Sequence, residues 1–206
     1  MIIGPDFAIG HISRTGGDAM RAYFRALNMP NVYIQSEENN AKHDPFHSRP
    51  DASGKKLYVV MIRKLDEWAL SQMNALYLEE SGKWRNSWIK SGCIKQREDL
   101  LNPECFLNIP YADLALAGKN GMLKGVHVTR WLRTEHLLED AQSLALDLGV
   151  SKNKVVSLAS VKTKPRLALD PNMQLFSKEQ KKKLYTINPV WATIETLANF
   201  PYARTA

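Results

Sequence analysis

The feature that most constrains this fold is the run KLYVVMI at residues 56–62, which is followed at once by a segment of helical periodicity. The run is continuous and rich in β-branched residues, which is typical of a strand covered on both faces. A helix is predicted over about residues 66–78, where Ala69, Met73 and Leu76 share one face. A strand followed by a covering helix is the repeating unit of a parallel sheet.

The same alternation precedes this unit. Residues 7–11 read as a short buried strand, and a helix over about residues 17–27 follows. Met20, Phe24 and Leu27 lie at helical spacing and predict its buried face. A second strand–helix unit therefore lies beside the first.

A third unit comes later in the chain. Residues 126–132 read as a strand and residues 135–148 as an amphipathic helix, with Thr134 as its expected N-cap and Gly149 as its stop. Three such units predict an α/β fold that is P-loop-like, with three layers and a central, mainly parallel sheet flanked by helices. Ligands of such sheets bind outside the carboxyl ends of the strands.

The remaining segments are less regular. Residues 81–122 predict short helices and loops, and residues 151–176 form a polar, lysine-rich connection. Residues 177–200 are helical in pattern, with an interruption before Pro189. Without repeats or low-complexity tracts, the pattern predicts a single domain over residues 1–206.

Composition narrows the classes of function. The formal net charge is +7 at pH 7, which favours anionic partners such as nucleic acid, a phosphorylated cofactor or an acidic glycan, although a solvated basic face explains it equally well. No run of about 18 apolar residues is present, so no membrane association is expected. The start of the chain lacks signal-peptide character. Two cysteines are too few for a disulfide framework and favour a cytoplasmic location.

The first strand–helix turn has the composition of a phosphate-binding loop. The loop and first helical turn contain Arg14, Thr15, Gly16, Gly17, Asp18 and Ala19. The two glycines allow close backbone approach, and the helix N-terminus offers unpaired N–H groups. Arg14 adds a cation and Thr15 a hydroxyl. The GxxxxGK[ST] pattern of a Walker A loop is absent, and an ordinary tight turn is the alternative interpretation.

A second candidate phosphate site follows the strand at residues 56–62. Arg63 stands at its carboxyl end, and Ser71 lies eight residues later in the next helix. A guanidinium fork and a hydroxyl can bind one phosphate together. The alternative is a pair of solvent-exposed side chains.

Together these segments resemble the sulfotransferases that use 3′-phosphoadenosine-5′-phosphosulfate (PAPS), especially the branch that includes carbohydrate sulfotransferases. HISRTGGD at residues 11–18 is similar to the family's HIPKTGGT, the loop for the 5′-phosphosulfate. RKLDEWALSQM at residues 63–73 is similar to RxPxxRxxSxY, the 3′-phosphate motif, and keeps Arg63 and Ser71 at the family spacing. The resemblance implies PAPS as donor, with 3′-phosphoadenosine-5′-phosphate (PAP) as product.

Further segments extend the resemblance in the same order along most of the chain. Lys42-His43 with Arg49 is similar to the family's Lys-His element, and residues 130–150 are similar to its later strand–helix segment. The tail NFPYA resembles the end of the family's closing helix. The basic loop at residues 161–166 resembles the family's loop that closes over the nucleotide, which implies cofactor contacts from Lys162, Lys164 and Arg166.

The sequence also departs from the family pattern. Arg14 replaces the lysine that in the family contacts the bridging oxygen, so Arg14 is a candidate catalytic residue whose fork differs from a point charge. Asp18 stands where a hydroxyl residue is usual, and it either repels phosphate or caps the helix N-terminus. Leu65, Trp68 and Met73 replace the proline, second arginine and tyrosine of the 3′-phosphate motif.

A general base should take the proton of the acceptor hydroxyl. The candidate is His43, because imidazole titrates near neutrality and the Lys-His resemblance indicates the same residue. His47, Asp44 and Glu135 are lesser candidates, and Pro45 disfavours a regular helix joining the two histidines. No His/Cys cluster has metal-site spacing, so no metal is expected.

The predicted function is transfer of a sulfuryl group from PAPS to a hydroxyl or amine acceptor, a small molecule or a carbohydrate. Trp84 and Trp88 could stack on a sugar or pack in the core. A P-loop nucleotide phosphotransferase and a catalytically impaired nucleotide- or glycan-binding protein of the same fold are the alternatives. No nucleic-acid partner is expected, because the cations do not line one helix.

Overall fold

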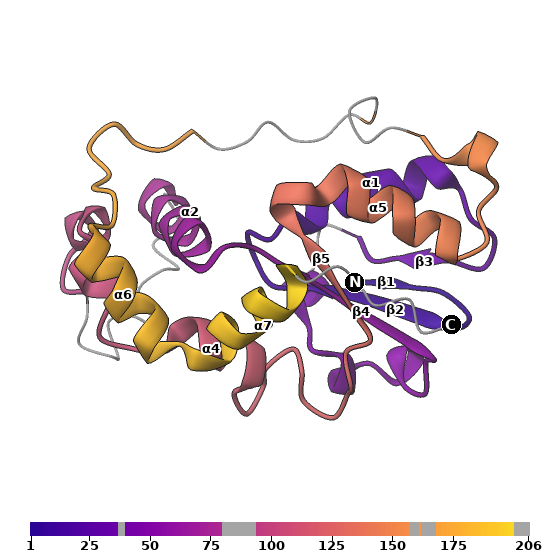
Figure 1. Cartoon of the computed structure of the whole chain (residues 1–206), viewed down its shortest axis with the longest axis horizontal. Coiled ribbons are helices and arrows are strands. Elements are labelled where there is room, and N and C mark those ends of the chain that lie inside the picture. Colours follow the sequence, from indigo (N-terminus) through magenta and orange to yellow (C-terminus); the bar gives the residue numbers. More distant parts are fainter. Residues whose placement is uncertain (37–39, 80–93, 157–160, 162–167, 200–206) are drawn as a thin grey trace.

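The computed structural model describes residues 1–36, 40–79, 94–156, 161 and 168–199 (Figure 1). Five strands form one sheet in the order β3-β1-β2-β4-β5. Their bounds are Ile2–Ile3 for β1, Phe7–His11 for β2, Tyr33–Ile34 for β3, Leu57–Ile62 for β4 and Arg130–Arg133 for β5. β2, β4 and β5 run parallel, and β1 is antiparallel to both of its neighbours. The predicted α/β class is confirmed, and the sheet is mixed.

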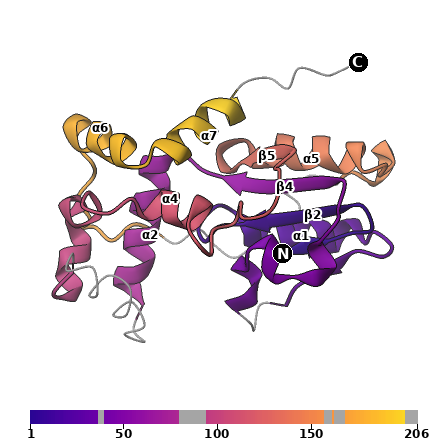
Figure 2. The same cartoon turned by 90° about the horizontal axis from the view of Figure 1, so that it is seen from below.

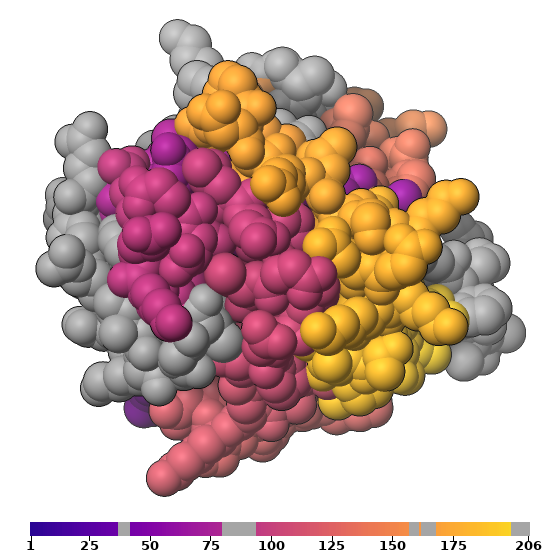
Figure 3. Space-filling view, turned by 90° about the vertical axis from the view of Figure 1, so that its left-hand side faces the viewer, coloured from indigo at the N-terminus to yellow at the C-terminus, as the bar shows by residue number. Residues whose placement is uncertain are grey.

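Six α-helices occur in the described part of the chain. They are α1 Gly17–Leu27, α2 Leu65–Leu78, α4 Tyr111–Ala117, α5 Leu137–Asp147, α6 Lys178–Ile187 and α7 Pro189–Asn199. α1 and α5 lie together on one side of the sheet, whereas α2, α4 and α6 gather beyond one end of its strands (Figure 1, Figure 2). The segment from residue 94 through α4 packs beside α6 and α7 (Figure 3). None of these helices has both the length and the apolar character needed to cross a bilayer.

Both faces of the central strands are covered. Along β4, Val59 and Met61 join the hydrophobic cluster beneath α1 and α5, while Val60 and Ile62 join the larger cluster on the other side. All four side chains are at most 2% exposed. The continuous apolar run is therefore explained by burial on two faces, as predicted.

The helix at residues 17–27 and the strand at residues 7–11 have the predicted bounds. The break before Pro189 is also confirmed, since α6 ends at Ile187 and α7 begins at Pro189. Gly149 ends the α5 segment as expected, with a left-handed φ of 81°.

The third strand–helix unit differs in detail from its prediction. β5 begins at Arg130 and not at residue 126. Immediately before β5, the Tyr58 N–H of β4 donates to the side-chain hydroxyl of Thr129 and not to a backbone carbonyl. α5 begins at Leu137 after a 3₁₀ turn, with His136 and not Thr134 at its N-cap. The prediction of Thr134 as the N-cap was wrong, because its hydroxyl lies against the backbone carbonyls of Thr15 and Ile62.

Candidate functional site

The two predicted phosphate sites lie side by side at the carboxyl ends of β2 and β4. These strands are parallel neighbours, with His11 opposite Met61. The loop after β2 folds back on itself, because both the N–H and the hydroxyl of Thr15 donate to the Ile12 carbonyl, at 3.3 and 2.7 Å. Thr15 is fully buried. Its hydroxyl therefore shapes the loop.

Two glycines are needed where the loop enters α1. Gly16, the N-cap, has a left-handed φ of 85°. A Cβ at Gly17 would lie 1.9 Å from Cδ2 of His11, so the histidine ring packs directly on the glycine. As a glycine, Gly16 has no side chain that could cap the helix. The N–H groups in the first turn of an α-helix have no acceptor within the helix, so α1 directs the positive end of its dipole at the loop.

Long-range hydrogen bonds fix the loop to the rest of the fold. The Trp68 indole N–H donates to the Ser13 carbonyl at 2.9 Å. The Thr134 hydroxyl lies 2.8 Å from the Thr15 carbonyl and 3.0 Å from that of Ile62, so it links the ends of β2 and β4. Sequence reasoning gave neither side chain this role, because the contacts join residues that no local pattern connects.

Arg14 is directed from the first predicted site toward the second. Its Nε donates to the Ser71 hydroxyl at 3.3 Å. Its backbone has a φ of 68°, which is unusual for a residue with a side chain. Partial burial and the nearby charge of Arg63 lower the pKa of Arg14, whereas Asp18 raises it. The structure thus brings Arg14, Ser71 and Arg63 together.

Arg63 is held from several sides. Its side chain is about nine-tenths buried, and Nη2 pairs with Glu67 at 3.2 Å. Its backbone carbonyl accepts a hydrogen bond from the Trp191 indole at 3.0 Å. Its Nε is buried and has no hydrogen-bond partner among the described residues. A buried donor without an acceptor is costly.

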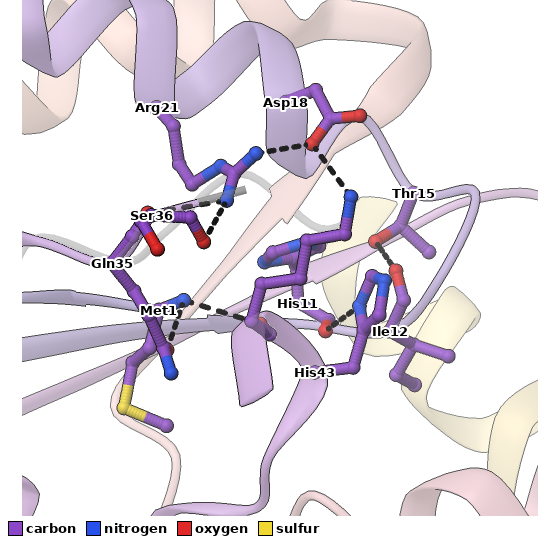
Figure 4. A network of polar contacts seen from close by, with 10 residues as sticks. Met1, His11, Ile12, Thr15, Asp18, Arg21, Gln35, Ser36 and His43 are labelled. Atoms are coloured by element: carbon purple, nitrogen blue, oxygen red, sulfur yellow. Dashed lines mark hydrogen bonds and ion pairs between the residues drawn. The ribbon is translucent and has the colours of Figure 1, made fainter. Parts of the chain in front are cut away.

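His43 lies against the end of β2 (Figure 4). Its Nδ1 is 3.3 Å from the His11 carbonyl, and the two imidazole rings meet edge to face with centroids 4.6 Å apart. A carbonyl can only accept, so Nδ1 carries the hydrogen and the neutral ring has its lone pair on Nε2. Burial lowers the pKa of His43, while the bond to His11 raises it. The ring therefore suits proton acceptance at neutral pH.

The Asp18 carboxylate is bound by two cations (Figure 4). Oδ1 lies 2.7 Å from Nη2 of Arg21 and 3.3 Å from Nζ of Lys42. Arg21 is fully buried and also donates to the carbonyls of Gln35 and Ser36. Two cations therefore offset the charge of the carboxylate for which the sequence suggested either repulsion of phosphate or capping of the helix.

Other candidate residues fall elsewhere. Arg49 makes a two-pronged pair with Asp51 at 3.0 and 2.7 Å, so it does not contribute an open guanidinium. The exposed His47 lies on a separate 3₁₀ turn from His43, and no regular helix joins them. Glu135 accepts the Lys64 N–H at 2.8 Å. Five of the candidate residues lie outside the described ranges: Trp84, Trp88, Lys162, Lys164 and Arg166.

The arrangement supplies the groups that anions require, because a helix N-terminus, two arginines and a hydroxyl lie at the ends of β2 and β4. The imidazole of His43 lies at the end of β2. Within the described residues, no group of His, Cys, Asp and Glu is arranged to hold a metal ion. No protein-family model, curated protein or solved structure matches this chain.

Proposed function

We propose that the chain is a sulfotransferase that uses PAPS as donor. The observation that carries the proposal is the convergence of Arg14, Arg63 and Ser71 at the ends of two adjacent parallel strands. These residues belong to two motifs that are separate in the sequence and each suited to phosphate. PAPS presents two phosphate-bearing ends, one at each side of its ribose, so it requires two such sites in one molecule.

The residues present fit this donor. The α1 N-terminus, with Gly16 as its N-cap, suits the 5′-phosphosulfate, because the N–H groups and the dipole of a helix N-terminus favour an anion. The unsatisfied Nε of Arg63 and the hydroxyl of Ser71 suit the 3′-phosphate. The proposal implies that the described α/β architecture is a P-loop-like three-layer fold, with the loop at residues 12–16 in the place of a Walker A loop.

Sulfuryl transfer requires a base, in-line geometry and stabilisation of negative charge. The acceptor oxygen attacks sulfur, the bond from sulfur to the 5′-phosphate oxygen breaks, and PAP leaves. We assign proton removal from the acceptor hydroxyl to Nε2 of His43, whose Nδ1 is fixed by the His11 carbonyl. Arg14 is assigned to the charge that develops on the leaving phosphate, since a guanidinium stays protonated.

The proposal is tested by calorimetric titration with PAP. Arg63→Ala and Ser71→Ala should each weaken PAP binding, the arginine by about 1.5–3 kcal/mol, the scale of a charge-assisted hydrogen bond. Arg25→Ala, in the last turn of α1, is the matched control and should leave the affinity unchanged. Unchanged affinity in folded Arg63→Ala and Ser71→Ala would contradict the site.

The same titration separates the alternatives. ATP binding in preference to PAP would favour a nucleotide phosphotransferase. Tight PAP binding without sulfuryl transfer from labelled PAPS to any acceptor in a panel of sugars, phenols and amines would favour a binding protein. Turnover that depends on His43 would support the full assignment.

A further inference from the structure

We infer that Asp18 is a positioning residue for His43, acting through an ion pair with Lys42. The inference deepens the proposed function and rests on it, because it concerns the group assigned as base. Asp18 is a departure from the family pattern and had been expected to repel phosphate or to cap α1. Its side chain instead connects the first turn of α1 to the 3₁₀ turn Asn40–His43.

The 3₁₀ turn is held at two neighbouring residues. Lys42 is held through its ammonium by Asp18, at 3.3 Å. His43 is held through Nδ1 by the His11 carbonyl, also at 3.3 Å. These contacts lead to α1 and to the end of β2, and the Lys42 carbonyl also accepts a hydrogen bond from the N-terminal ammonium of Met1 at 3.1 Å. Together they fix the position and the orientation of the His43 imidazole.

The Asp18–Lys42 pair is less exposed than an ordinary surface pair, so it can hold the 3₁₀ turn in place as a rigid support, which we call the strut. The Lys42 side chain is 21% exposed and that of Asp18 is 42% exposed, whereas the exposed pair Lys56–Asp6 has values of 82% and 67%. Arg21, which is fully buried, holds the carboxylate from behind at 2.7 Å. Because Arg21 already restricts the Asp18 side chain, less conformational entropy is lost when Lys42 pairs with it.

The inference predicts a loss in turnover without a loss in donor binding. Lys42→Met removes the ammonium, keeps the aliphatic stem and leaves Asp18 paired with Arg21. It should lower kcat by about tenfold, the order expected when a reacting group is displaced, while PAP affinity changes by less than about twofold. Asp18→Asn should lower kcat at least as much, because it weakens the pair with Arg21 as well as the pair with Lys42. Adding Lys42→Met to Asp18→Asn should cause no further loss, because the Asp18–Lys42 pair is already broken.

Two variants serve as controls. Lys42→Arg can still reach Asp18 and should retain most of the turnover. Lys56→Met breaks a lysine–aspartate pair of similar length, 3.2 Å, at the surface and should leave kcat unchanged. Equal effects of Lys56→Met and Lys42→Met would overturn the inference. A fall in PAP affinity that matches the fall in kcat would also overturn it, by making Lys42 a donor-binding residue.

A second readout does not depend on activity. In Lys42→Met, amide hydrogen exchange at residues 42 and 43 should rise by about tenfold, and the ¹⁵N signals of the His43 ring should shift toward a mixture of tautomers. Unchanged exchange and ring signals would overturn the strut whether or not PAPS is turned over. If the unaltered protein transfers no sulfuryl group, the proposed function fails, and faster exchange at this turn would still support the strut.

Discussion

Arg14 combines a charged side chain with a backbone conformation that favours glycine. Its φ of 68° costs free energy for any residue with a Cβ, and such strain is usual where a side chain must be aimed. The side chain reaches Ser71 from the neighbouring unit. A residue that only closed a turn would not need to be arginine here.

Comparison of two variants isolates this cost. Arg14→Gly and Arg14→Ala both lose the guanidinium, but only alanine keeps the left-handed penalty. We expect the free energy of unfolding, measured by urea denaturation, to be about 1 kcal/mol higher for Arg14→Gly than for Arg14→Ala. PAP affinity should fall equally in both variants. Equal stability of the two would show that the backbone is not strained.

At the level of elements, the turn between β4 and α2 is held by carboxylates from later in the chain. Glu195 of α7 accepts the Leu65 N–H at 2.9 Å and is bonded by the Tyr185 hydroxyl at 3.0 and 3.1 Å. Burial raises the pKa of Glu195, and the charges of Asp66 and Glu135 raise it further. The Leu65 and Tyr185 bonds partly offset that rise.

This arrangement gives a pH dependence of definite sign. Because the folded-state pKa of Glu195 lies above its ordinary value of 4.5, its stabilising contribution is complete below that pH and is lost as pH rises through the folded pKa. Glu195→Gln keeps both hydrogen bonds without the charge. It should raise the free energy of unfolding at pH 7 by up to about 1 kcal/mol, with no gain below pH ~4. Glu195→Ala should be destabilising at both.

The sequence predicted the helices and strands better than it predicted the long-range contacts that hold them together. The periodicities of α1 and β2 are local, and their bounds were correct because the neighbouring glycines and apolar residues determine them. Trp68 shows the limit. In sequence it only replaced a family arginine, whereas in the fold its indole holds the Ser13 carbonyl. That contact depends on how β2 and α2 pack, which spacing along the chain cannot reveal.

The candidate site was predictable to a similar extent. Arg14 and Arg63 were identified because each follows a strand, and Ser71 because it lies eight residues after Arg63 in the next helix. The parallel pairing of β2 with β4 explains why these segments lie side by side. The engagement of Asp18 by Lys42 and Arg21 was missed, because the charge of one residue was considered without the turn that approaches it from residues 40–43.

On the scale of the whole molecule, the last described helix closes onto the first half of the chain. Trp191 of α7 is fully buried and packs against Trp68, with ring centroids 4.7 Å apart and the ring planes tilted by 35°. Its indole N–H donates to the Arg63 carbonyl. The strand end that carries Arg63 is therefore completed by a residue far away in sequence.

Trp191→Phe tests this closure. Phenylalanine keeps an aromatic ring against Trp68 but leaves the buried Arg63 carbonyl without its donor. The free energy of unfolding should fall by about 1–3 kcal/mol, with part of the loss due to the smaller ring. Thr196→Ala, on the exposed side of the same helix, is the control and should change stability by less than about 0.5 kcal/mol. Equal losses would contradict the role of the indole.

The contact between Trp191 and Arg63 has a consequence for biosynthesis. The two residues are 128 positions apart, so at about 5–20 residues per second a ribosome would need roughly 6–26 s to make the second after the first. During that interval the Arg63 carbonyl lacks its indole donor. The Leu65 N–H likewise lacks its acceptor, the Glu195 carboxylate of α7. The strand end that carries Arg63 should therefore reach its final structure late, after the sheet strands have emerged.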